Sequence, residues 1–167
     1  MTAATAKTLL DYTAEDLMSR DLLLIPHRMS LRAAAHLLAQ AHVSGAPVVD
    51  DAGRCVGVLS ATDLVHWIDR GGRALKRAAR ASSCVCADWE IVGIQEMPED
   101  ETWRFMTDDV VTADAGERVG GLARRMIDAH IHRVVVVDAV GRPVGVVAST
   151  DVLAAVAACE ARREFGD

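Results

Sequence analysis

The sequence predicts an α/β (α+β) fold in which one β-α-β-β-α unit is used twice. The first observation is an internal repeat, because the heptapeptide GVLSATD at 57–63 returns 88 residues later as GVVASTD at 145–151. The second is the composition: 51% of the residues are apolar but only 4% are aromatic, so the core must consist mainly of aliphatic side chains. A repeat of this kind indicates one supersecondary unit used twice so that two incomplete apolar faces can cover each other.

Length, charge and cysteine usage restrict the class of protein. A chain of 167 residues suffices for one ordinary domain or two small ones. The four cysteines have neither paired CxxC spacing nor the density of a disulfide framework, which favours reduced thiols. No signal-type apolar region or stretch of about 20 apolar residues occurs, so we expect a cytoplasmic protein with no membrane contact. The formal net charge of −6 argues against nucleic acid as a partner.

The first copy is expected at 13–70, after an N-terminal leader at 1–12. Thr13 and Asp16 are spaced to cap a short helix. The apolar run 22–25, ended by a proline, predicts a short buried strand. A helix with one apolar face should start after Ser30, and its inward positions are Leu31, Ala34, Ala35, Leu38 and His42.

A hairpin and a second helix should complete the first copy. Strands are expected at 43–50 and 55–59, around a turn that contains glycine. Pro47 lacks an N–H and is therefore expected at a strand start or on a sheet edge. The stretch 60–63 should cap the next helix. Its inward residues are predicted to be Leu64, Val65, Trp67 and Ile68.

The second copy is expected at 103–160, followed by a tail at 161–167. It should contain a strand at 110–112, a hairpin of 131–138 with 143–147, and a helix from about Thr150. Asp114 and Glu117 are predicted to form a capping pair. The helix after them should have an apolar face of Val119, Leu122, Ala123, Met126 and Ile127. The insert 71–102 is interpreted as a connector with a basic, solvated beginning, or alternatively as a partner surface.

The repeated heptapeptide contains residues suited to a ligand with phosphate or sugar oxygens. Gly57 and Gly145 lie inside predicted strands, which indicates the close approach of another backbone or a ligand. Ser60 and Thr62 fall at a helix start, where backbone N–H groups favour anions. Asp63 could accept hydrogen bonds from two neighbouring ribose hydroxyls, each worth about 1.5–3 kcal/mol. A single copy would indicate no more than a helix cap, whereas its repetition favours a ligand site.

The repeat, with Gly-hydrophobic-hydrophobic-Ser/Thr-x-x-Asp after its hairpin, resembles a pair of cystathionine-β-synthase-type (CBS) domains, a stand-alone Bateman module. The resemblance covers about 13–70 and 103–160. It implies two repeats packed around a pseudo-twofold axis, with two clefts for an adenosine-containing ligand such as AMP, ADP or ATP. It also implies a non-enzymatic sensor that needs no other cofactor, signals to an unidentified effector protein and forms a homodimer.

The resemblance further implies nucleotide sites that combine residues of both copies. Arg133 offers a planar, permanently charged fork for phosphate. The first cleft would be lined by Asp63, Thr62, Ser60, Thr107, Thr112, His132 and Arg133. The second cleft would be lined by Asp151, Thr150, Ser149, Ser19, Leu24 and Ser44. Ala148 stands there in place of a hydroxyl and Ser44-Gly45 in place of the His-Arg pair, so we expect a weaker or empty second site.

Two other classes of function stay open. One is a constitutive dimer or assembly protein whose clefts are vestigial. The other is a metal-binding protein or enzyme that uses the segments 130–132 (His-Ile-His) and 84–86 (Cys-Val-Cys), neither of which has the spacing of a zinc motif or completes a catalytic set. We expect His42 and His130 to be helix-end residues rather than ligands.

Overall fold

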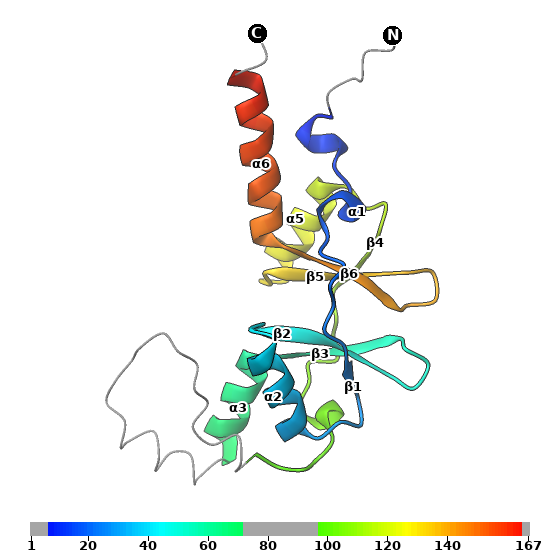
Figure 1. The fold of residues 1–167 in the computed structure, drawn as a ribbon, viewed down its shortest axis with the longest axis vertical. Coiled ribbons are helices and arrows are strands. Elements are labelled where there is room, and N and C mark those ends of the chain that lie inside the picture. Colours follow the sequence, from blue (N-terminus) through cyan, green and yellow to red (C-terminus); the bar gives the residue numbers. More distant parts are fainter. Residues whose placement is uncertain (1–6, 72–96, 165–167) are drawn as a thin grey trace, which may run out of the picture. The chain divides into compact units, whose positions relative to one another are not determined.

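The structure is a computed structural model that describes residues 7–71 and 97–164 of the chain. The chain divides into two compact units, and each unit contains one three-stranded sheet (Figure 1). One unit is Leu23–Val110, and the other joins Met1–Leu22 to Val111–Asp167. Each unit therefore contains the N-terminal segment of the other copy: residues 13–22 of the first copy belong to the unit of the second, and residues 103–110 of the second copy belong to the unit of the first.

The unit Leu23–Val110 has the order β-α-β-β-α. Its sheet has the order β1-β2-β3, with β1 parallel and β3 antiparallel to β2. Helices α2 and α3 lie on the same side of this sheet (Figure 1). The elements are β1 (Ile25–Pro26), α2 (Leu31–Gln40), β2 (Gly45–Val49), β3 (Cys55–Ser60), α3 (Ala61–Gly71) and a 3-10 helix at Thr102–Arg104. The largest fully buried apolar side chains are Ile25, Leu31, Val48, Leu59 and Met97.

The other unit repeats this order after two short N-terminal helices. Its sheet has the order β4-β5-β6, again with one parallel and one antiparallel pairing. The elements are a 3-10 helix at Leu9–Asp11, α1 (Ala14–Leu17), β4 (Thr112–Asp114), α5 (Val119–Asp128), β5 (Arg133–Val137), β6 (Pro143–Ala148) and α6 (Ser149–Glu164). Its core contains Ala14, Ala113, Leu122, Val134, Val136 and Val147. The predicted α/β class and the repeated β-α-β-β-α unit are confirmed.

Several local predictions are confirmed because they depend on residues close in sequence. The Asp16 carboxylate accepts hydrogen bonds from the N–H and the hydroxyl of Thr13, both at 2.8 Å. The Ser30 hydroxyl accepts the Ala33 N–H at 3.3 Å at the start of α2. His42 and His130 follow helices with φ values of 52° and 53°, so both are helix-end residues.

The two hairpin turns are built alike, which supports the repeat. Asp50 accepts N–H groups from residues two and four positions later at 3.0 and 2.8 Å, and Asp138 does the same at the same distances. Gly53 and Gly141 have φ values of 79° and 83°, a backbone conformation that glycine adopts without strain. The sequence Asp-x-x-Gly-Arg is therefore the local determinant of both turns.

The first strand of each unit lies nearer the C-terminus than predicted. The predicted strands at 22–25 and 110–112 are observed as Ile25–Pro26 and Thr112–Asp114. Apolar side chains before these strands, Leu23 and Val111, pack against the cores without belonging to a strand. Apolar content alone therefore misplaced the strands, because their position depends on the register with β2 and β5.

The prediction for Pro47 is wrong, because this residue lies in the middle of the central strand β2. Pro47 faces Val58, whose N–H and carbonyl both bond to Thr107 and not to β2. The missing N–H therefore points to the other side of β2, where the pairing with β1 starts only at the next residue. The proline thus removes no hydrogen bond from this part of the ladder.

The start of α5 also differs from the prediction. Helix α5 begins at Val119 with Arg118 at the cap position, so Asp114 and Glu117 are not its capping pair. The Asp114 carboxylate instead accepts an N–H within its own turn at 2.9 Å, and Glu117 accepts the Arg125 guanidinium at 2.7 Å. The repeat aligns Arg118 with the capping Ser30, and only the first copy carries a capping hydroxyl at this position.

The predicted apolar helix faces are partly wrong. Val65 is 51% exposed and Ile127 is 70% exposed, although both were expected to face inward. Each follows a buried residue, Leu64 or Met126, and the helical rotation of about 100° per residue turns it away from the core. Trp67 is partly buried against its core as predicted.

Part of the insert lies outside the described residues. The residues that the structure does not describe include 72–96, so the predictions for the basic beginning of the insert and for Cys84 and Cys86 fall there. The end of the insert is described: Met97 is fully buried, and its carbonyl accepts two bonds from Arg32 at 2.8 and 3.2 Å. Within 7–71 and 97–164, no helix is long and apolar enough to span a membrane.

Candidate functional site

Asp63 lies at the junction of strand β3 and helix α3. Its Oδ2 atom accepts the Ser60 N–H at 2.8 Å and the Ser60 hydroxyl at 2.6 Å. The Asp63 N–H is 3.4 Å from the Ser60 hydroxyl, which completes a reciprocal cap of the helix. The predicted capping role of this stretch is confirmed, and Thr62 is exposed on the first turn.

A segment from the end of the unit brings a further hydroxyl to Asp63. Thr107 and Val58 exchange two backbone hydrogen bonds, at 2.9 and 3.0 Å, along the edge of β3. The Thr107 hydroxyl donates to Oδ1 of Asp63 at 3.0 Å, across 44 residues of sequence. The structure therefore brings together Ser60, Asp63 and Thr107 from the predicted set.

The nearest atoms to both strand glycines belong to methionine side chains, which the prediction of a nearby backbone or ligand did not name. An ideal Cβ on Gly57 would lie 2.3 Å from Sδ of Met106. An ideal Cβ on Gly145 would lie 2.3 Å from Sδ of Met18. The sequence repeat aligned the two methionines but assigned them no role. The two methionines are 88 residues apart, as are the two glycines, and this shared offset was the sequence signal that could have shown the packing.

Asp151 occupies the equivalent position in the other unit. Its Oδ2 atom accepts the Ala148 N–H at 2.7 Å, at the start of helix α6. Ser19 exchanges two backbone hydrogen bonds with Val146, at 2.9 and 3.0 Å, as Thr107 does with Val58. We call the surroundings of Asp63 and of Asp151 the two half-sites. They share one backbone framework, in which a methionine and then a hydroxyl residue follow the edge of the last strand.

The carbonyls that precede the hairpins complete this framework. The His132 carbonyl accepts the Ser149 N–H at 2.9 Å, and the Ser44 carbonyl accepts the Ala61 N–H at 2.9 Å. The side chains of His132 and Ser44 are exposed, as is that of Arg133. His132 and Ser44 therefore each hold the start of a helix in their own unit through a backbone carbonyl.

The predicted cleft sets are divided between the units. The first set has Ser60, Thr62, Asp63 and Thr107 in Leu23–Val110, and it has Thr112, His132 and Arg133 in the other unit. The second set has Ser19, Ser149, Thr150 and Asp151 in the unit with α6, and it has Leu24 and Ser44 in Leu23–Val110. The crossed combination of these half-sites stays a prediction.

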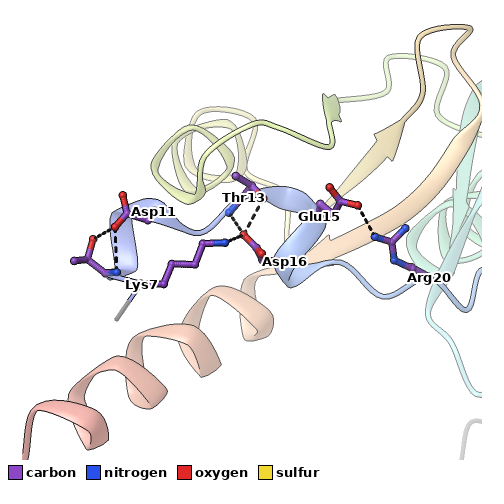
Figure 2. A network of polar contacts seen from close by, with 7 residues as sticks. Lys7, Asp11, Thr13, Glu15, Asp16 and Arg20 are labelled. Carbon is purple, nitrogen blue, oxygen red and sulfur yellow. Dashed lines mark hydrogen bonds and ion pairs between the residues drawn. The ribbon is translucent and has the colours of Figure 1, made fainter. Parts of the chain in front are cut away.

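A polar network holds the N-terminal segment that carries Met18 and Ser19. Figure 2 shows Asp16 receiving hydrogen bonds from Lys7 and Thr13, beside an ion pair of Glu15 with Arg20. The hydrogen bonds from Lys7 and then from Thr13 lower the pKa of Asp16 from 3.8 to about 2. The carboxylate therefore stays ionised and bonded across the physiological pH range. The sequence indicated the Thr13 contact but not the contact with Lys7.

Nucleophilic and metal chemistry receive little support from the described residues. Burial raises the pKa of the Cys55 thiol, which keeps it in the neutral, less reactive form. In the part of the chain that the structure describes, no group of three or more His, Cys, Asp or Glu side chains is placed to hold a metal ion.

Comparison with known families gives a match over most of the chain. The family model described as "CBS domain" matches residues 14–70 and 102–158. Among curated proteins, an uncharacterized protein of Methanocaldococcus jannaschii is 28% identical over 124 residues, which is 74% of this chain and 32% of the relative. The L-aspartate semialdehyde sulfurtransferase of the same organism is 24% identical over 138 residues, 83% of this chain and 22% of the relative. The chain thus spans about a third or less of these curated relatives.

Solved structures of the same fold cover nearly the whole chain. A CBS domain pair in complex with 5′-methylthioadenosine and S-adenosyl-L-methionine has a TM-score of 0.67 at 22% identity, covering 88% of this chain and 97% of that one. The protein CBSX2 in complex with AMP also has a TM-score of 0.67, at 24% identity, covering 89% of this chain and 98% of that one. At these identities the likeness shows the fold alone.

Proposed function

This chain belongs to the CBS domain family, and on that premise we propose that it is a non-enzymatic regulatory module that binds an adenosine-containing ligand. The observation that carries the proposal is the repeated placement of a carboxylate, Asp63 or Asp151, at the junction of a strand and a helix. Each is accompanied by an exposed hydroxyl on the first helical turn, at Thr62 or Thr150.

The chemistry of each junction suits a nucleoside. A carboxylate accepts hydrogen bonds from ribose hydroxyls, and such charge-assisted bonds are worth about 1.5–3 kcal/mol. The N-termini of α3 and α6 present backbone N–H groups, which favour a phosphate. Arg133 is the proposed phosphate partner because its guanidinium matches phosphate oxygens and its side chain is exposed.

We propose AMP, ADP or ATP as the first ligands to test. Similar folds in complex with AMP and with 5′-methylthioadenosine and S-adenosyl-L-methionine support an adenosine-containing class. The sulfurtransferase relative does not favour catalysis here, because this chain matches 22% of its length. Signalling would require an effector protein, and we propose that both act in the cytoplasm.

A homodimer is the proposed form in solution. Its support is the exposure of one apolar residue on each of three helices, namely Val65 on α3, Ile127 on α5 and Leu153 on α6. A symmetric copy could cover such residues. Light scattering that gives the mass of a monomer at micromolar concentration would exclude this form.

Thermal unfolding with a ligand panel tests the proposed function. AMP, ADP, ATP, adenosine and S-adenosylmethionine are each added at increasing concentration, and a ligand at 100 times its Kd should add about 2.7 kcal/mol of stability. Calorimetry then compares Asp63→Ala and Asp151→Ala with Asp128→Ala, an exposed carboxylate on α5 that serves as the matched control. We expect each site variant to lose one binding event and the control to lose none. An absence of stabilisation by the whole panel would refute an adenosine-binding role.

Arg133→Ala separates phosphate recognition from nucleoside recognition. We expect it to weaken AMP by roughly 10- to 150-fold, since a charge-assisted hydrogen bond is lost, and to leave adenosine unchanged. Equal weakening of AMP and adenosine would show that Arg133 does not bind the phosphate.

A further inference from the structure

The carboxylates of Asp63 and Asp151 differ in how many hydrogen bonds the protein already donates to them. A carboxylate has about four acceptor positions, two on each oxygen. Asp63 accepts two bonds on Oδ2, from the N–H and hydroxyl of Ser60, and one on Oδ1, from Thr107. Among bonds between described residues, Asp151 accepts one, on Oδ2, from the Ala148 N–H.

The difference arises from side chains and not from the backbone. The repeat places Ala148 where the other copy has Ser60, so one hydroxyl donor is missing beside Asp151. It places Ser19 where the other copy has Thr107, and both residues make the same pair of backbone bonds to a neighbouring strand. The equivalent carboxylates therefore stand in equivalent frameworks with unequal acceptor capacity.

Acceptor capacity decides how a ribose can be bound. The 2′ and 3′ hydroxyls of a ribose form a vicinal diol that donates two hydrogen bonds to one carboxylate. Asp151 can accept both without losing a bond to the protein. Asp63 can accept one on Oδ1, and a second would have to displace the hydroxyl of Thr107 or Ser60. Such an exchange replaces one bond to a carboxylate by another and adds little affinity.

We propose that Asp151 is the diol-reading carboxylate of this protein and that Thr107 is a specificity-determining residue that limits Asp63 to a single ligand hydroxyl. This inference rests on the proposed function, because it concerns the sugar of the same adenosine-containing ligand. It follows that the half-site of Asp151 discriminates ribose from 2′-deoxyribose, whereas the half-site of Asp63 binds both nearly equally.

Calorimetry with adenosine and 2′-deoxyadenosine tests this inference on the full chain. The Asp63→Ala variant reports the Asp151 half-site, and we expect it to bind adenosine at least about 10-fold more tightly, as one charge-assisted bond predicts. The Asp151→Ala variant reports the Asp63 half-site, where the ratio should be about 3-fold or less. Adding Thr107→Val to that variant removes the competing hydroxyl while keeping the β-branched shape, and the ratio should rise to about 10-fold.

Two further variants serve as controls. Thr107→Ser in the Asp151→Ala background keeps a hydroxyl and should keep the low ratio. Asp128→Ala in the Asp63→Ala background changes an exposed carboxylate on α5 that belongs to neither predicted cleft, and it should leave the high ratio within about twofold.

The outcomes distinguish the inference from the function on which it rests. Adenosine binding with equal ratios at both half-sites, or a ratio that Thr107→Val leaves low, overturns the inference and upholds the adenosine-binding role. Failure of the parent chain to bind adenosine overturns the proposed function and the inference together.

Discussion

Alanine in place of the strand glycines tests the Met–Gly packing. A Cβ at residue 57 would lie 2.3 Å from Sδ and 2.8 Å from Cγ of Met106, so that side chain must move. At residue 145 the added atom would lie 2.3 Å from Sδ and 2.8 Å from Cβ of Met18. A Cβ atom follows the backbone and cannot be moved by a change of rotamer. Gly145→Ala must therefore shift the backbone at Met18, whereas Gly57→Ala can be relieved by the side chain of Met106.

The expected magnitudes follow from two opposing effects. Overpacking lowers the free energy of unfolding by about 1–3 kcal/mol. Replacing a strand glycine by alanine raises it by about 0.5–1 kcal/mol, because alanine loses less backbone entropy on folding. We expect Gly57→Ala to lose about 1 kcal/mol or less and Gly145→Ala to lose about 2 kcal/mol in the free energy of unfolding. For a chain of this size, each kcal/mol corresponds to a fall of about 2–4 °C in Tm.

Urea unfolding followed by circular dichroism measures these losses, and Gly120→Ala is the matched control. A Cβ at Gly120 meets no atom within 4 Å, and the residue lies in helix α5, so alanine there should stabilise by up to about 1 kcal/mol. A double-mutant cycle of Gly145→Ala with Met18→Ala should show a favourable coupling, because the truncation removes the Sδ contact at 2.3 Å while the Cβ contact at 2.8 Å stays. Stabilisation by Gly145→Ala, or a coupling of zero, would refute the packing argument.

Two further predictions concern stability. The pKa of Asp16 is lowered to about 2, so its stabilising bonds are fully present above the unfolded pKa of 3.8 and are lost as the pH falls toward 2. Urea unfolding should therefore show a smaller loss of stability from pH 5 to pH 2.5 in Asp16→Asn than in the parent. An equal loss in the two proteins would contradict the assigned bonds. Leu122→Ala, at a fully buried position of α5, should lower the free energy of unfolding by about 2–5 kcal/mol. Ile127→Ala, on the exposed side of the same helix, should lower it by about 0.5 kcal/mol or less. Similar Tm values for the two variants would show that the helix faces are wrongly assigned.

The sequence by itself determined the features that depend on near neighbours. The Thr13–Asp16 cap joins residues three positions apart, as does the Ser60–Asp63 cap. The apolar stripe of α2 and the Asp-x-x-Gly-Arg turns likewise need only local spacing. Because these signals recur at one offset, they also established the repeated β-α-β-β-α order and the positions of Asp63 and Asp151.

Only the tertiary structure decided the features that join distant segments. It assigned each N-terminal segment to the unit formed by the other copy, it placed Met106 on Gly57, and it bonded the Thr107 hydroxyl to Asp63. Apolar content could not fix the positions of β1 and β4, and helical periodicity did not show that Val65 is exposed. The physical reason is that register, side-chain packing and the choice of hydrogen-bond partner depend on which segments meet in space, and spacing along the chain does not contain that information.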